Sequence, residues 1–128
     1  MSATATTWTL RFSDGSGNAF RLERDPQRGP PRLSYDPVRP LTSSSGTYDG
    51  GEAHSDLALT ESVAEQLWQR AQALIADTRQ HQTARSMGTG LLRWVCGDDE
   101  GRVILTPTAG RAFEARLRAL VDNPDAPD

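Results

Sequence analysis

The chain has 128 residues, enough for one domain and too few for two conventional hydrophobic cores. Its formal net charge of −3 is too small to indicate a class of partner, and a single cysteine excludes an intrachain disulfide. The sequence shows neither signal-peptide features nor an apolar run long enough to cross a membrane. We therefore expect a soluble cytoplasmic protein without membrane association.

The first predicted element is a β-hairpin. Apolar residues alternate with polar ones over residues 8–12 and again over 20–23, a period typical of strands with one buried face. Residues 14–18 (Asp-Gly-Ser-Gly-Asn) tolerate the positive φ angles that a reversing loop requires.

A proline-rich segment follows. Residues 25–46 hold five of the eight prolines, so we expect a loop with at most an edge strand around Leu33–Tyr35, because proline removes ladder donors. Leu57 and Leu59 alternate around the residue between them, which predicts one further strand within residues 48–59.

The clearest predicted element is a helix that begins after Thr60, a suitable N-cap, and ends near Gln80. Its apolar side chains form one stripe, which predicts that Trp68 is buried between the helix and the sheet. The stripe consists of Val63, Ala64, Leu67, Trp68, Ala71, Leu74 and Ile75.

The rest of the chain predicts a loop over 81–90, a second hairpin and a last helix. The hairpin strands are Leu91–Cys96 and Arg102–Leu105, joined by an acidic turn. Thr106-Pro107 is a good helix start, and the helix should reach about Val121.

These elements predict a single α+β domain over residues 7–121, with flexible tails at 1–6 and 122–128. Its single antiparallel sheet would be built mainly from two β-hairpins, with two α-helices packed on one face.

Metal and cofactor signatures are weak. Asp14, Ser16 and Asn18 match the first ligands of a calcium loop, but the Gly and Glu required later in such a loop are absent. Asp98–Glu100 would need further ligands from elsewhere in the chain. We expect no metal and no cofactor.

One enzyme hypothesis stays open. Ser43–Ser45, His54 and Asp56 have the residue types of a hydrolytic triad, without a Gly-x-Ser-x-Gly elbow. Cys96 alternates with Trp94, which favours a small buried thiol over a nucleophile. The alternative function is therefore a small hydrolase-like enzyme that uses His54 with a nearby Ser or Asp.

Anion binding and nucleic-acid binding are also considered. Gly88-Thr-Gly90 is too short for a phosphate loop, although with Arg85 it could form a small anion nest. The basic residues of the last helix have no interleaved aromatics, and the chain is net acidic, so nucleic acid is an unlikely partner.

The leading hypothesis is a non-enzymatic protein-binding or regulatory module whose partner is another protein; a homodimer is also considered. The order of elements, with a helix between two strand pairs, is similar to that of small bacterial peptidase inhibitors of the emfourin type. This similarity rests on the order of elements and not on a residue motif. It illustrates an inhibitor-like binding role.

The predicted binding surface is the glycine-rich segment before the predicted helix, together with the loop before the second hairpin. Glycines allow a partner to approach the backbone closely, and loops on a rigid scaffold often carry binding residues. The candidate residues are Tyr48, Asp49, Gly50, Gly51, His54, Arg85, Gly88 and Gly90.

Overall fold

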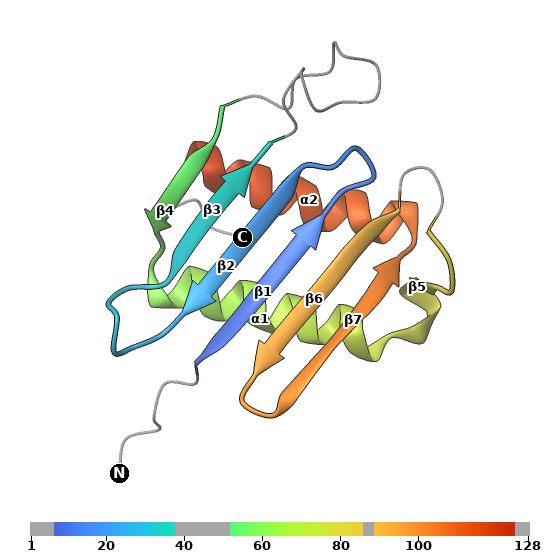
Figure 1. Ribbon diagram of the computed structural model, residues 1–128, viewed down its shortest axis with the longest axis horizontal. Helices are drawn as coiled ribbons and strands as arrows, with labels where there is room; N and C mark the ends of the chain where they lie inside the picture. Colours follow the sequence, from blue (N-terminus) through green and yellow to red (C-terminus); the bar gives the residue numbers. More distant parts are fainter. Residues whose placement is uncertain (1–6, 38–51, 86–88, 125–128) are drawn as a thin grey trace.

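A computed structural model describes residues 7–37, 52–85 and 89–124 (Figure 1). The elements in chain order are β1 (Trp8–Ser13), β2 (Ala19–Arg24), β3 (Arg32–Asp36), β4 (His54–Ala58), α1 (Glu61–Ala76), η2 (Thr78–Gln80), β5 (His81–Gln82), β6 (Gly90–Cys96), β7 (Asp99–Leu105) and α2 (Pro107–Asp122).

The strands form one antiparallel seven-stranded sheet in the order β4-β3-β2-β1-β6-β7-β5. β1 lies inside the sheet, between its hairpin partner β2 and the distant β6, so the β1–β6 ladder joins the two halves of the chain (Figure 1).

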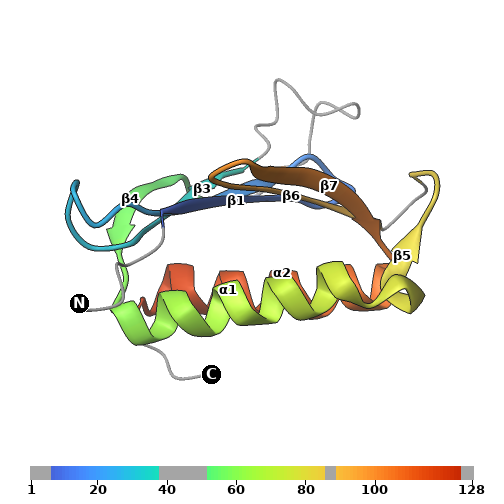
Figure 2. The same cartoon turned by 90° about the horizontal axis from the view of Figure 1, so that it is seen from below.

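Both helices cover the same face of this sheet and cross its strands in opposite directions (Figure 2). The core lies between the two layers, because every second strand residue is apolar and points toward the helices. Leu10, Phe12, Leu22, Leu92 and Phe113 are among its fully buried side chains. The predicted α+β fold with two helices on one face is confirmed.

The predicted helix starts are confirmed by their caps. Thr60 Oγ1 accepts a hydrogen bond from the Val63 amide at 3.1 Å, and Thr106 Oγ1 accepts one from the Ala109 amide at 3.4 Å. α1 ends at Ala76 rather than near Gln80, because Asp77 leaves the helical conformation and its side chain caps η2.

Three strand predictions require correction. β3 is not an edge strand, since β4 pairs along its other side. The predicted loop over 81–90 contributes β5, which pairs with the end of β7. The second hairpin turn is shorter than expected, because Gly97 adopts a φ of 62° and pairing resumes at Cys96–Asp99.

Trp68 lies where its helical position predicts, against the sheet. Its ring stacks on that of Trp8, with ring centroids 4.9 Å apart and an interplanar angle of 11°. Trp8 is buried, but Trp68 is half-buried at the rim of the core rather than buried as predicted.

Of the predicted tails, residues 1–6 and 125–128 lie outside the described residues. Asp122 is the last residue of α2 and Asn123 is its C-cap, so the helix ends one residue beyond the predicted Val121.

Candidate functional site

The face of the sheet opposite the helices, here called the open face, is not covered by any described element (Figure 2). It displays the strand residues that alternate with the core residues. In β1 these are Thr9, Arg11 and Ser13, and in β6 they are Leu91, Arg93 and Val95.

Four arginines from four adjacent strands lie directly opposite one another on the open face. Arg11 pairs with Arg21 of β2 on one side and with Arg93 of β6 on the other, and Arg93 pairs with Arg102 of β7. With strands about 4.8 Å apart, this arginine row is about 14–15 Å long. All four residues are exposed.

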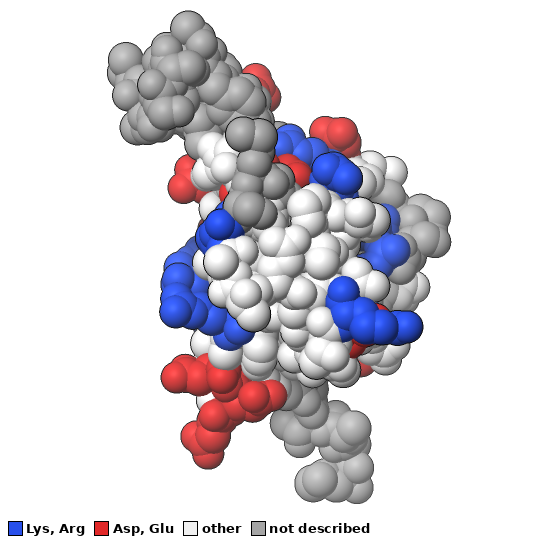
Figure 3. Space-filling view, turned by 90° about the vertical axis from the view of Figure 1, so that its right-hand side faces the viewer, with Lys and Arg blue, Asp and Glu red and all other residues white. Residues whose placement is uncertain are grey.

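The charge of the arginine row is little compensated. Arg21 forms an ion pair with Glu23 at 3.1 Å, whereas Arg11, Arg93 and Arg102 have none within the described residues. Like charges directly opposite one another destabilise a sheet, so sheet stability does not explain this arrangement. In Figure 3 the open face is in profile at the left, where basic side chains gather above acidic ones.

A hollow of about 570 Å³ lies beside the row on the open face. Small side chains from β1, β2 and β3 form part of its lining, namely Ser13, Ala19 and Ser34. Arg11, Arg21 and Arg93 reach it from the row. The hollow is thus a concave polar region bordered by cations.

Toward β4 the charge changes sign. Asp36 and Asp56 line the same hollow, at the end of the row occupied by β3 and β4. The ladder between β3 and β4 is irregular at this point: Asp56 has a φ of 54°, and its amide donates to Ser34 Oγ at 3.0 Å. The cationic part of the open face therefore covers β2, β1, β6 and β7.

Apolar side chains of β6 and β7 flank the cationic row on the open face. Leu91 and Ile104 lie opposite one another on the open face and are half-buried. Val95 is 46% exposed. A molecule resting on this part of the open face would meet guanidinium groups and aliphatic side chains together.

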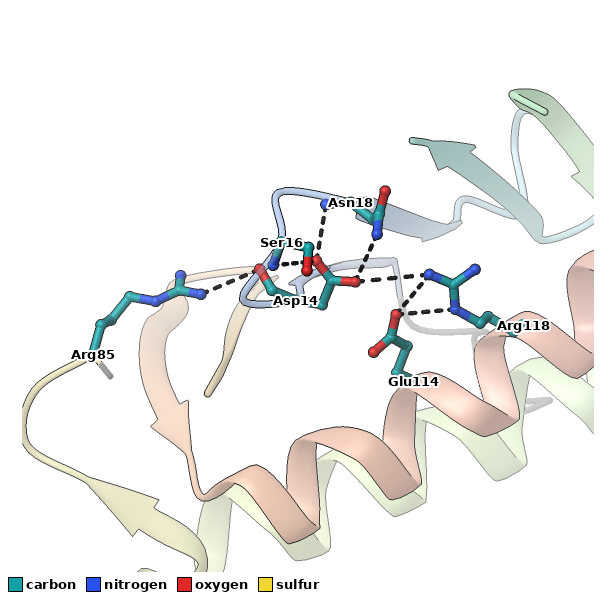
Figure 4. A network of polar contacts seen from close by, with 6 residues as sticks. All are labelled: Asp14, Ser16, Asn18, Arg85, Glu114 and Arg118. Atoms are coloured by element: carbon teal, nitrogen blue, oxygen red, sulfur yellow. Dashed lines mark hydrogen bonds and ion pairs between the residues drawn. The ribbon is translucent and has the colours of Figure 1, made fainter. Parts of the chain in front are cut away.

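A second polar cluster fixes the β1–β2 turn to α2 (Figure 4). The Asp14 carboxylate accepts hydrogen bonds from the amides of Ser16 and Asn18, both at 2.9 Å, and from Asn18 Nδ2 at 2.8 Å. Arg118 Nη2 lies 3.7 Å from Asp14 Oδ2 and 2.9 Å from Glu114 Oε2. Asp14 thus acts as a turn residue rather than an open calcium ligand.

Asp14 and Glu114 form an unequal pair of carboxyl groups. Burial alone would raise the pKa of Asp14, but hydrogen bonds from Glu114, Asn18 and Ser16 more than offset it and lower that pKa. Burial raises the pKa of Glu114, and its hydrogen bond to the Asp14 carboxylate raises it further despite Arg118. The pKa values of these two neighbouring carboxyl groups therefore shift in opposite directions.

The structure separates the residues that the sequence proposed as a binding surface. Tyr48, Asp49, Gly50, Gly51 and Gly88 lie outside the described residues. His54 begins β4 and lines the hollow.

Arg85 and Gly90 lie on the β6 side of the sheet, and strands β3, β2 and β1 separate them from His54 in β4. One Arg85 Nη2 donates to the carbonyls of Asp14 and Thr89, at 3.3 and 3.1 Å, so this side chain links two loops (Figure 4). Gly90 is buried against the Phe12 ring, on the face of the sheet that the helices cover.

Only some of the residues proposed for a hydrolase-like enzyme lie within the described ranges. Ser43–Ser45 lie outside the described residues, and His54 and Asp56 both line the hollow. Within the described part of the chain, the His54 ring has no hydrogen bond to a serine or to Asp56. A nucleophile and its base have to lie within hydrogen-bond reach, and these described residues do not meet that condition.

No group of three or more His, Cys, Asp or Glu residues within the described ranges is placed to hold a metal ion. None of the described helices is long and apolar enough to cross a membrane.

The arginine row was not predicted from the sequence. The signal was present in part, since Arg11 and Arg21 alternate with core residues of the same hairpin. Recognising the row also required the pairing of β1 with β6, which joins residues far apart in the sequence.

No protein-family model, curated protein or solved structure matches the chain. Function has to be inferred from the chemistry of the surface itself.

Proposed function

We propose that this protein is a non-enzymatic binding domain that holds an acidic segment of another protein against its open face. The observation that carries the proposal is the arginine row, in which four guanidinium groups project from adjacent strands with a single ion pair among them in the described structure. An uncompensated row of like charges lowers the stability of the sheet, and binding of an anion restores that stability.

Arginine suits carboxylate recognition. Its planar guanidinium forms two parallel hydrogen bonds with one carboxylate, which gives direction as well as attraction. Regular strand spacing sets the Cα atoms of the four arginines at intervals of about 4.8 Å, so one short segment can contact several of their side chains.

The surroundings of the row favour protein over nucleic acid. Leu91, Val95 and Ile104 offer aliphatic contacts to apolar side chains of a partner. Single-stranded nucleic acid is usually held by aromatic stacking, and the residues of β1, β2, β3, β6 and β7 that alternate onto the open face include no Phe, Tyr or Trp.

Fluorescence polarisation tests this proposal with two labelled probes, a glutamate-rich peptide that also contains leucine and the same peptide with glutamine for glutamate. We expect the acidic probe to bind and the neutral probe not to bind. Replacing Arg11 and Arg93 with Gln should weaken binding about tenfold or more, since charged hydrogen bonds contribute about 1.5–3 kcal/mol each.

The matched control removes two arginines elsewhere. Arg79 and Arg111 are exposed in η2 and α2, away from the open face, so the Arg79→Gln/Arg111→Gln variant has the same net charge as the row variant. Equal loss of binding in both variants, or tighter binding of oligo-dT than of the acidic peptide, would contradict the proposal.

A further inference from the structure

We propose that the free edge of β7 pairs with the same edge of a second copy of this chain, in an antiparallel register centred on Gly101. This inference concerns the edge of the sheet and needs no ligand on the open face, although Arg102 belongs both to the arginine row and to this edge.

The outer edge of β7 is paired over only part of its length. β5 covers Ile104 and Leu105, while no described strand pairs with Asp99–Val103 on that side. Exposed sheet edges are templates for strand pairing and are normally protected by charge, proline or a covering element. Within the described residues, β7 therefore has an unpaired edge of about five residues, to which a strand of another chain can be added.

The orientation of the backbone fits such pairing. The Thr106 amide donates to the Gln80 carbonyl at 2.8 Å, which shows that this residue directs its main-chain groups away from β6. Main-chain groups of alternate strand residues point to the same edge. Glu100 and Arg102 therefore direct their amides and carbonyls toward the free edge.

A register centred on Gly101 makes the charges complementary. It places Glu100 opposite Arg102 of the second copy and, by two-fold symmetry, Arg102 opposite Glu100 of that copy. Each of these pairs can exchange both main-chain hydrogen bonds, and both side chains lie on the open face. Neither residue has an ion pair within the described structure.

Gly101 suits the centre of this pairing. The two Gly101 residues would face each other as a non-hydrogen-bonded pair, where Cα atoms approach to about 4.5 Å. The Trp94 ring lies over Gly101, since a Cβ added there would be 2.6 Å from Trp94 Cζ2. Trp94 and Val103 are partly buried on the helix side, so they would add apolar area next to the dyad.

The surface around this edge is compatible with a self-contact. Figure 3 faces the β7 and β5 edge, and the centre of the view is a broad area of uncharged side chains bordered by arginines and acidic residues. A short edge buries little area, so we expect a weak and concentration-dependent dimer. In this dimer Arg102 faces Glu100 of the second copy, while Arg11, Arg21 and Arg93 stay available on each open face.

Sedimentation velocity over a concentration series that reaches the millimolar range tests the dimer. The wild-type protein should shift from monomer toward dimer as concentration rises. Glu100→Arg and Arg102→Glu should each abolish the shift, because each places like charges opposite one another twice. The double variant Glu100→Arg/Arg102→Glu should restore dimerisation, since the pairs are then exchanged.

Mixing the two single variants provides the most specific readout. One has Arg at both positions and the other has Glu at both, so they should form a heterodimer although neither self-associates. Circular dichroism and thermal unfolding would show that both remain folded, as expected for changes at exposed positions. A wild-type monomer at all concentrations, or a dimer that the single variants leave intact, would overturn the proposal.

Discussion

Arg11 is the residue at which structure and stability conflict most clearly. It lies between Arg21 and Arg93 and has no ion pair in the described structure. Cross-strand pairs of like charge are destabilising, and this residue takes part in two of them. A residue kept at such a position is better explained by binding than by folding.

Replacing Arg11 with Thr should therefore increase the free energy of unfolding by about 0.5–1 kcal/mol, since it removes two like-charge pairs and introduces a good strand former. Urea denaturation at low salt would measure the gain. The gain should shrink in high salt, where surface charges are screened. A destabilised variant would mean that the Arg11 side chain has a structural role.

Glu114 gives a prediction that depends on pH. Its pKa is raised above the ordinary value of 4.5, so its contribution to stability is full below that value and is lost as pH rises through the raised pKa. The pKa of Asp14 is lowered from 3.8, so its contribution is lost only as pH falls through the lowered value. The two carboxyl groups together stabilise the fold most at pH values between the lowered pKa of Asp14 and the raised pKa of Glu114.

Glu114→Gln removes the ionisation of this side chain, so stability is no longer lost there as pH rises. The amide of the new glutamine can still donate a hydrogen bond to Asp14. The variant should gain stability relative to wild type between pH 4.5 and pH 7, as measured by urea denaturation at both values. A difference in stability that does not change between these two values would argue against a raised pKa of Glu114 in the folded protein.

At the level of elements, α2 approaches β6 through two glycines. A Cβ added at Gly90 would lie 2.5 Å from Phe12 Cε1 and 3.6 Å from the Gly110 Cα. Because Phe12 is fully buried between Phe20 and Phe113, its ring has little room to move. The close contact sets the position at which the helix crosses the sheet.

Gly90→Ala should destabilise the fold by about 1–3 kcal/mol through overpacking. Chemical denaturation measures the loss. The double variant Phe12→Leu/Gly90→Ala serves as the control, because a smaller side chain at position 12 should make the alanine less costly than it is alone. Independent, additive costs would show that the Phe12 ring is not the obstacle.

The sequence allowed good prediction of the elements that depend on local pattern. Alternation identified the hairpin strands of β1 and β2, and the caps at Thr60 and Thr106 identified both helix starts. β3 and β4 were harder, because their pairing depends on each other rather than on their own short and proline-flanked segments.

The candidate site was less predictable than the fold. Each arginine of the row looks like an ordinary exposed strand residue on its own, and only the sheet register makes the four adjacent. Attention to glycine-rich loops favoured residues 48–51, which lie outside the described structure, and Gly90, which is buried.

At the scale of the whole molecule, charge is distributed by face. The chain is net acidic, yet the strand residues on one row of the open face are all basic from β2 to β7. Local potential rather than net charge steers an approaching anion, so an acidic protein can still attract an acidic partner to this face.

The position of β1 also has a consequence for how the chain folds. β1 is synthesised before the other described strands, but one of its two edges is completed only by β6, which follows α1 in the chain. Until then, the apolar strand with Leu10 and Phe12 is the outer strand of a partial sheet. Ladders between distant segments form slowly, so the late β1–β6 closure is the step at which folding and aggregation compete.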